Sequence, residues 1–417
     1  MENRGDMKVW GLFFLAFTFA TFCLCLHRIL TSTRTQSYDE DMSAKLFRHL
    51  IDQNHLDDQF FNEERNRALV CDLITCTEPR DAKNRDAFLF DIIANYRNSI
   101  DADKFDYIPR DCYTLNWGYN DRIPERLMMN SRVIENTICF KTKVSYDCYA
   151  FFGQRLDLHQ QVYTHAVVKA ADLMIGDVFC YANDVFRIKE NAEDPETFSL
   201  LNDTLLNEIE RSTTDDNNLR KAQDIIKRLR KRDLYQSCGD ILLQTTKENL
   251  FENANEEIIA KYAPSSADLR ASHFSLQTTV FDYAMKDKNP IDFVRFYNSD
   301  TDLSPHSVPK SSVSNFAPEV FKEKKLRVFC KERGKEEALK AAFQKYCEAV
   351  DSGRKDSPIT LISAAPTYSP TPRGITKVVS SATTTPRSHK KLDFDSAATK
   401  DASKPDGDEP DRKRLRM

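Results

Sequence analysis

The sequence predicts a mainly α-helical body, then a small α+β lobe and a disordered C-terminal tail. Three observations predict this order: apolar residues recur at three- and four-residue spacing before residue 240, short alternating segments appear between 241 and 350, and proline, serine and threonine accumulate after 351. The length of 417 residues is ample for a hydrophobic core. A net charge of −4 excludes a uniformly basic nucleic-acid coat and a polyacidic chain.

Residues 1–36 form an apolar leader. The stretch 9–26 carries no charge, and at ~1.5 Å per residue in a helix it nearly spans the hydrocarbon core of a bilayer. Arg28 and Arg34 follow it before any acidic residue, which would keep the body in the cytosol. Taken by itself, this segment favours a single-pass membrane anchor. The alternatives are a signal peptide and an N-terminal exon that is foreign to the mature protein.

Residues 37–240 are predicted to form the helical body. Leucine and isoleucine recur on one face within 200–209, and a second amphipathic stretch follows at 222–229. The polar run 213–218 between them predicts a turn that supplies the N-cap of the second helix. The eleven cysteines contain no CxxC pair, which favours reduced, buried thiols over a disulfide framework or a zinc ribbon.

Residues 241–350 are predicted to form the α+β lobe, and residues 351–417 the tail. The segments 274–280 and 326–329 predict strands, and 336–350 predicts a final helix. The tail carries 13 Lys and Arg residues against 9 Asp and Glu residues, and seven of the sixteen prolines. Its last basic cluster is typical of nuclear import signals. The same charge makes the tail the feature that favours nucleic-acid binding.

A first candidate site lies in residues 101–111. Asp103, Tyr107 and Asp111 are four residues apart and share one helix face, provided that the helix tolerates Pro109. An aspartate on this face could ligate a metal ion, with Lys104 beside it for phosphate oxygens. A solvated acidic face is the alternative interpretation.

A second candidate site has Arg155, His159 and Tyr163 at the same four-residue spacing. A guanidinium, an imidazole and a phenol on one face suit a phosphorylated ligand that carries a ring, although surface polar groups give the same pattern. Lys141 and Lys143 would share a face if their segment is extended. They would then meet either phosphate or solvent.

Three runs, in order along the chain, resemble one protein family. They are RNSIDADKFDYIPRDC at 97–112, RLDLHQQVYTH at 155–165 and DYAMKDKNPIDFVRFY at 282–297. The chain resembles the SAM-and-HD-domain deoxynucleoside triphosphate triphosphohydrolases over roughly residues 40–350. This resemblance implies that the helical body is a partial HD-type domain.

The resemblance also implies a chemistry. Enzymes of this family hydrolyse a dNTP to a deoxynucleoside and triphosphate, as dGTPases do, at a divalent metal (zinc or iron, with magnesium) held by His, His-Asp and Asp. In the family, dNTP or GTP at allosteric sites drives oligomer assembly.

The motif match assigns residues to these roles. Asp103 matches a metal ligand. The substrate positions match Lys104, Tyr107, Asp111, Arg155, His159 and Tyr163. The allosteric nucleotide contacts match Arg126, Lys141, Lys143, His165 and Lys288.

The chain also departs from the family pattern. None of its eight histidines is followed directly by aspartate, and the resemblance begins only near Glu40, past the family's SAM domain and first metal ligands. We therefore expect a truncated, catalytically impaired homologue in the nucleus or cytosol. It would retain nucleotide binding or assembly, with itself or with an intact paralogue. The alternatives are an active dNTPase with a different N-terminus, and a membrane-anchored or nuclear interaction module.

Overall fold

The fold is described by a computed structural model. The described residues are 38–56, 64–75, 87–117, 122–198, 201–243, 250–316, 318–352 and 361–362. The predicted leader, the basic cluster at the C-terminus and most of the predicted tail lie outside them. No helix within these ranges is long and apolar enough to cross a membrane.

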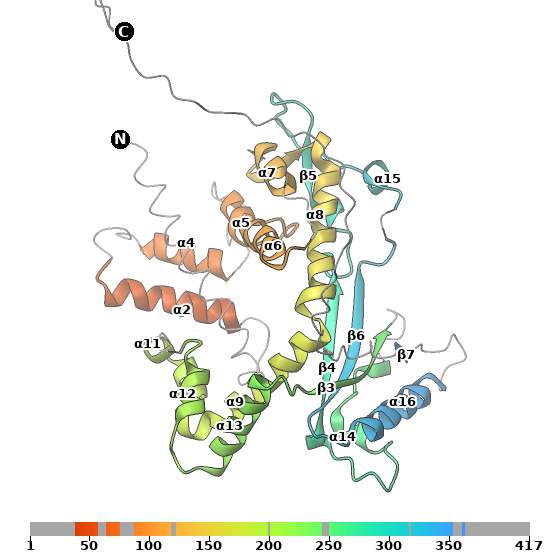
Figure 1. Ribbon diagram of the computed structural model, residues 1–417. Coiled ribbons are helices and arrows are strands. Elements are labelled where there is room, and N and C mark those ends of the chain that lie inside the picture. Colours follow the sequence, from red (N-terminus) through yellow and green to blue (C-terminus); the bar gives the residue numbers. More distant parts are fainter. Residues whose placement is uncertain are drawn as a thin grey trace, which may run out of the picture. The chain divides into compact units, whose positions relative to one another are not determined.

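The body is mainly helical, as predicted (Figure 1). Short η1 (Thr142–Val144) precedes α8, and a π-helical turn, η2 (His159–Tyr163), directly follows it. The α-helices of the body are α2 (Tyr38–Gln53), α4 (Glu64–Ile74), α5 (Ala87–Ile93), α6 (Ala102–Leu115), α7 (Arg122–Met129), α8 (Ser145–Leu158), α9 (Ala166–Phe186), α10 (Ile188–Glu193), α11 (Pro195–Phe198), α12 (Leu205–Arg211) and α13 (Asn217–Arg230).

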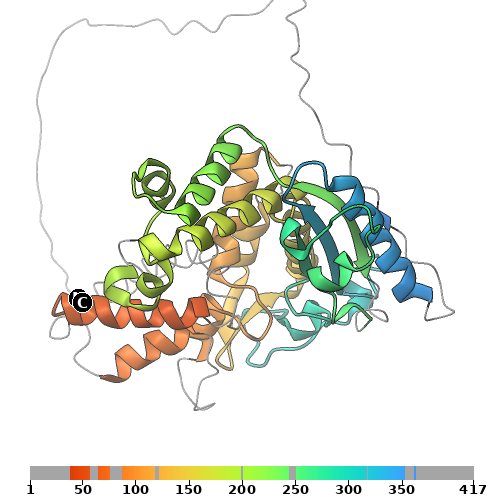
Figure 2. The same ribbon diagram turned by 90° about the horizontal axis from the view of Figure 1, so that it is seen from below.

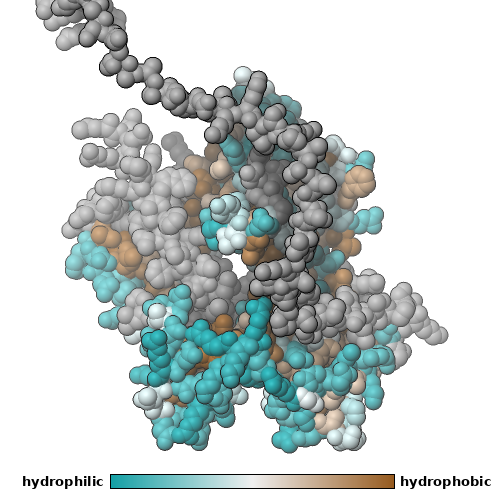
Figure 3. Space-filling model, viewed as in Figure 1, coloured by the Kyte–Doolittle hydropathy of each residue, from teal (hydrophilic) through white to brown (hydrophobic). Residues whose placement is uncertain are grey.

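The predicted polar turn separates α12 from α13 and caps the second helix. The Asp216 side chain accepts a hydrogen bond from the backbone N–H of Leu219 at 2.7 Å, which satisfies a free donor of the first turn. The apolar face of α13 packs along α9, and the two helices lie side by side in Figure 2. Hydrophilic side chains gather over α12 and α13 on the face drawn in Figure 3.

The lobe is an antiparallel sheet covered by a helix. Its strand order is β4-β6-β3-β7, and the predicted strands and final helix are present. At the bulge in β3, a Cβ on Gly239 would lie 3.2 Å from the Phe343 ring, so α16 approaches the sheet closely there. The elements of the lobe are β3 (Gln236–Leu243), β4 (Phe274–Asp282), β6 (Lys322–Cys330), β7 (Leu361–Ile362), α14 (Glu256–Ala260), α16 (Glu336–Ser352) and η4 (Ala271–His273). Between β4 and β6 the chain also forms η5 (Pro290–Phe293) and α15 (Lys310–Val313), which contact α8 of the body.

A second small sheet was not predicted from the sequence. It has the order β1-β2-β5, with β1 (Ser131–Ile134) antiparallel and β5 (Arg295–Tyr297) parallel to β2 (Thr137–Lys141). These strands are three to five residues long, too short for alternation to show. Because β5 pairs with β2, a segment that the sequence placed in the lobe packs on the helical body.

The core beneath this sheet joins the first candidate site to the second. Phe151 and Phe152 of α8 are fully buried, and the Phe105 ring of α6 stacks on Phe151 with centroids 5.1 Å apart. Ile291 and Phe296, from the segment around β5, belong to the same cluster. Cys112 and Cys148 are buried in this cluster, which agrees with the buried thiols predicted from the cysteine pattern.

Candidate functional site

Helix α6 presents the first candidate set on one face. It runs through Pro109 without a break and ends at Asn116, whose left-handed backbone closes the helix (φ 50°). Asp103, Tyr107 and Asp111 therefore do share a face, as their spacing predicts.

A buried network fixes the start of α6. The Asp101 carboxylate caps the helix and accepts both the backbone N–H of Asn95 at 3.2 Å and the Lys104 ammonium at 3.0 and 3.1 Å. Asn95 also donates to the buried Asn98 side chain at 2.9 Å. Asp101 is not among the predicted site residues, although aspartate is a favoured residue at the N-cap of a helix. Its effect is to hold Lys104 in place.

The second set lies on α8 and the π-turn that follows it. The Thr164 backbone N–H bonds to the His159 carbonyl five residues back at 3.1 Å, and the Thr164 hydroxyl bonds to the same carbonyl at 2.8 Å. Such π-turns are frequent at functional sites. This one begins with His159 and ends with Tyr163.

The two helices bring the two sets together. The Tyr163 hydroxyl donates to Asp111 at 2.5 Å, across the gap between η2 and α6. The Tyr163 ring lies edge-on to His159, with centroids 5.1 Å apart, and to Tyr107 at 6.2 Å. The six predicted substrate residues (Lys104, Tyr107, Asp111, Arg155, His159 and Tyr163) are called the α6–α8 cluster below.

Arg155 connects the α6–α8 cluster to the lobe sheet. Its Nη1 donates to the Asp282 carbonyl at 2.8 Å and reaches the Asp282 carboxylate at 3.4 Å. Its Nε is buried and has no hydrogen-bond partner among the described residues. A buried donor without an acceptor is costly, so the guanidinium is oriented but not satisfied.

Burial and neighbouring charges set the protonation of the cluster. Burial, then Arg155, Lys104 and Lys169, lowers the pKa of His159 to about 4, so this imidazole is neutral at pH 7. Burial raises the pKa of Asp103 to about 6, against the attraction of Lys104. Burial also raises the pKa of the Tyr163 hydroxyl, which stays protonated. The result is a neutral imidazole and a phenol beside cations.

The described residues supply one predicted ligand for the metal ion, Asp103. Asp103 is half-buried, and burial raises its pKa to about 6, so the carboxyl is still mostly ionised at pH 7. No group of three or more His, Cys, Asp or Glu residues in the described ranges could hold a metal. Metal ligation by Asp103 therefore stays a prediction from resemblance.

The five predicted allosteric residues (Arg126, Lys141, Lys143, His165 and Lys288), called the peripheral group below, lie on separate elements. Arg126 pairs with Asp147 at 2.9 Å, and Lys141 pairs with Asp300 at 3.0 Å. His165 caps α9 by accepting the Val167 N–H at 3.3 Å, and Lys288 lies 5.4 Å from the Phe293 ring centroid.

The predicted lysine pair does not form as expected. Lys141 ends β2, but residues 142–144 turn into η1, and Lys143 is exposed on that turn. An extended segment, which the shared face requires, is therefore absent between the two lysines.

Known proteins with the same sequence pattern include several SAMHD1 proteins. The chain is 35% identical over 308 residues to the "Deoxynucleoside triphosphate triphosphohydrolase SAMHD1 homolog" of Dictyostelium discoideum, covering 74% of this chain and 58% of that protein. It is 34% identical over 343 residues to the SAMHD1 protein of Bos taurus, covering 74% and 57%. The chain is a member of the SAMHD1 family.

The human SAMHD1 protein is 32% identical over 288 residues, covering 63% of this chain and 45% of that protein. The chain thus spans about half the length of the SAMHD1 proteins it matches. No family model matches it. The family resemblance found in the three sequence runs is confirmed.

Proposed function

We propose that this chain binds deoxynucleoside triphosphates in the α6–α8 cluster. The observation that carries the proposal is the buried Nε of Arg155, which has no hydrogen-bond partner among the described residues, together with the positive charges of Arg155 and Lys104 that act on His159. Arginine and lysine together suit the oxygens of a polyphosphate. The names of the relatives state that they act on deoxynucleoside triphosphates.

Each part of the cluster has a role in this proposal. Lys104, held by Asp101, and Arg155, held by Asp282, present fixed positive charge to phosphate oxygens. Neutral His159 offers a ring nitrogen for a hydrogen bond. Tyr163, held by Asp111, offers an aromatic surface for the sugar. The internal partners pre-orient these groups, which lowers the entropic cost of binding.

We expect the 417-residue chain to hydrolyse nucleotide weakly. None of its histidines is directly followed by aspartate, and metal-assisted hydrolysis needs several protein ligands with an open position for water. Release of inorganic triphosphate from dGTP, with Mg²⁺ or Mn²⁺ added, measures this directly. If the parent chain released triphosphate rapidly and the Asp103→Ala protein did not, this result would favour the alternative of an active enzyme.

Nucleotide binding is tested by calorimetric titration with dGTP. Arg155→Ala is expected to weaken binding by about tenfold to a hundredfold, because hydrogen bonds to a charged group are lost. Arg220→Ala is the matched control, since Arg220 is an exposed arginine of α13 paired with Asp215. Equal affinities for the Arg155→Ala and Arg220→Ala proteins would contradict the proposal.

Assembly and location belong to the same proposal. We propose that nucleotide bound at the peripheral group promotes association with further copies of the chain or with an intact paralogue. Sedimentation with and without GTP or dNTP tests this, and a mass that nucleotide leaves unchanged would contradict it. Imaging with a C-terminal tag tests the expected nuclear or cytosolic location.

A further inference from the structure

The end of strand β2 carries a lysine that an acidic loop already neutralises. Lys141 is the last residue of β2, and its ammonium contacts both carboxylate oxygens of Asp300, at 3.0 and 3.2 Å. Asp300 belongs to residues 298–302, called the acidic loop below, which directly follows β5. Because β5 is parallel to β2, the two strands end side by side, and the loop begins beside Lys141.

The acidic loop is fixed at its tip by an arginine. The Arg132 guanidinium donates to the carbonyl oxygens of Asp300 and Asp302 and lies over the Tyr297 ring, 4.7 Å from its centroid. Its Nε is buried without a hydrogen-bond partner among the described residues. Arg132 therefore orders the loop through main-chain atoms and leaves the Asp300 carboxylate to Lys141.

The base of the acidic loop is also fixed. The Asp302 carboxylate accepts the backbone N–H groups of Asn298 at 2.8 Å and Ser299 at 3.0 Å, and these bonds lower its pKa. The backbones of Phe296 and His306 form a reciprocal pair at 2.8 and 2.9 Å, which closes the loop. The loop is thus a closed, internally bonded turn that presents Asp300 in one position.

The two charges differ in exposure. The Lys141 side chain is 25% exposed and the Asp300 side chain 76% exposed. An anion that binds the Lys141 ammonium must therefore compete with the Asp300 carboxylate, which already contacts it. Such an exposed pair is weak, so a polyphosphate with several negative charges can displace it.

We propose that the acidic loop is a tethered competitor for phosphate, and that a nucleotide must displace Asp300 to bind at Lys141. The inference rests on the nucleotide role proposed for the peripheral group. It adds a determinant of affinity, Asp300, that the family resemblance did not select. Loss of the Asp300 charge exposes Lys141, whereas loss of Lys141 removes the site.

Inorganic triphosphate is the probe, titrated by calorimetry at low salt into the full chain carrying Arg155→Ala, so that the α6–α8 cluster contributes little. Asp300→Ala in this background is expected to bind triphosphate about two- to fivefold more tightly, the factor that corresponds to a surface ion pair. Asp300→Asn, which keeps the side-chain shape, is also expected to bind triphosphate more tightly. The gain should shrink as salt is raised.

The matched control is Asp224→Ala, because Asp224 is 71% exposed and pairs with Lys227 at 2.9 Å. This control is expected to leave the affinity unchanged. Addition of Lys141→Ala to the Asp300→Ala protein is expected to abolish the gain. Unchanged or weaker binding in both Asp300 variants, a gain that survives Lys141→Ala, or no binding by any variant would each overturn the inference. Failure of nucleotide binding at the α6–α8 cluster shows separately, as equal dGTP affinities of the Arg155→Ala and Arg220→Ala proteins.

Discussion

The α6–α8 cluster and the peripheral group are both rich in cationic and aromatic side chains, but the structure holds them differently. The cluster's side chains contact one another across two helices, as in the bond from Tyr163 to Asp111. The peripheral side chains lie on separate elements, where Arg126 and Lys141 are paired with nearby acids. The elements that carry Arg126, Lys141 and Lys143 pack on the same core as the cluster, through Leu127, Phe140 and Val144. The difference is that the peripheral charged groups pair with nearby acids or lie exposed, and do not contact one another as the cluster's side chains do.

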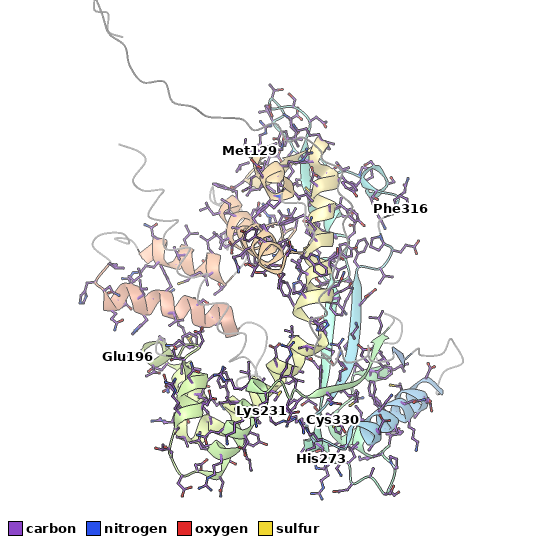
Figure 4. The ribbon with its side chains drawn as sticks, in the orientation of Figure 1. Met129, Glu196, Lys231, His273, Phe316 and Cys330 are labelled. Atoms are coloured by element: carbon purple, nitrogen blue, oxygen red, sulfur yellow. The ribbon has the colours of Figure 1, made fainter. Side chains whose placement is uncertain are left out.

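The core under the α6–α8 cluster also shifts the pKa values of the cluster's ionisable side chains and of Asp103 beside it. Half-burial lowers the pKa of His159 to about 4 and raises that of Asp103 to about 6. In the peripheral group the charged ends are near water. Met129, which is labelled in Figure 4, lies at the end of α7, the helix that also carries Arg126, and is 80% exposed. The comparison predicts large effects of mutation in the core and small ones at the periphery.

The largest effect is expected from Phe152→Ala. Phe152 is fully buried in the core under the α6–α8 cluster, so its truncation should lower the free energy of unfolding by about 3–5 kcal/mol. Urea unfolding followed by circular dichroism measures the loss. Met129→Ala, the control, should change the same free energy by less than ~0.5 kcal/mol. Similar losses in the two variants would remove the distinction between core and periphery.

An intermediate effect is expected from the pH dependence that His159 imposes. The His159 pKa is about 4 in the folded chain, against an ordinary value near 6.5, so only the unfolded chain takes up a proton between these pH values. His159 therefore contributes stability that is present above pH ~6.5 and is lost as the pH falls towards 4. His159→Gln should flatten this slope by about 1–3 kcal/mol across the window.

Asp103 should have the opposite effect on the pH dependence of stability. The Asp103 pKa of about 6 in the folded chain lies above the ordinary value of 3.8, so folding becomes less favourable as the pH rises between these values. Asp103→Asn should remove that loss and stabilise the protein at pH 7 by about 1–3 kcal/mol. Unfolding curves at pH 4, 5, 6 and 7 compare both variants with the parent. If both substitutions changed the slope of the unfolding free energy against pH in the same direction, the two groups would not be buried as described.

The smallest effect is expected from Arg126→Ala in the peripheral group. The Arg126 side chain is 55% exposed and pairs with Asp147, and exposed pairs contribute about 0–1 kcal/mol. The free energy of unfolding should change by that amount at low salt and by less at high salt. A loss that equals that of Phe152→Ala would show that the periphery also has a structural role.

Local patterns in the sequence predicted much of the helical structure. The cap at Asp216 and the four-residue spacing on α6 depend on residues within one or two turns. Such contacts are encoded locally, and the structure confirms the corresponding helices. Strands β1, β2 and β5 were missed because each is short and is stabilised by a partner elsewhere in the chain.

The sequence by itself determined the mainly helical class, the shared face on α6 and the family. Only the tertiary structure decided which side chains meet. Tyr163 bonds to Asp111 across 52 positions, and Lys141 pairs with Asp300 across 159. No periodicity links positions that far apart, because their contact depends on how buried faces pack and how β2 and β5 pair. The Arg155 Nε, which has no partner among the described residues, and the Lys141 ammonium paired with Asp300 are consequences of that packing.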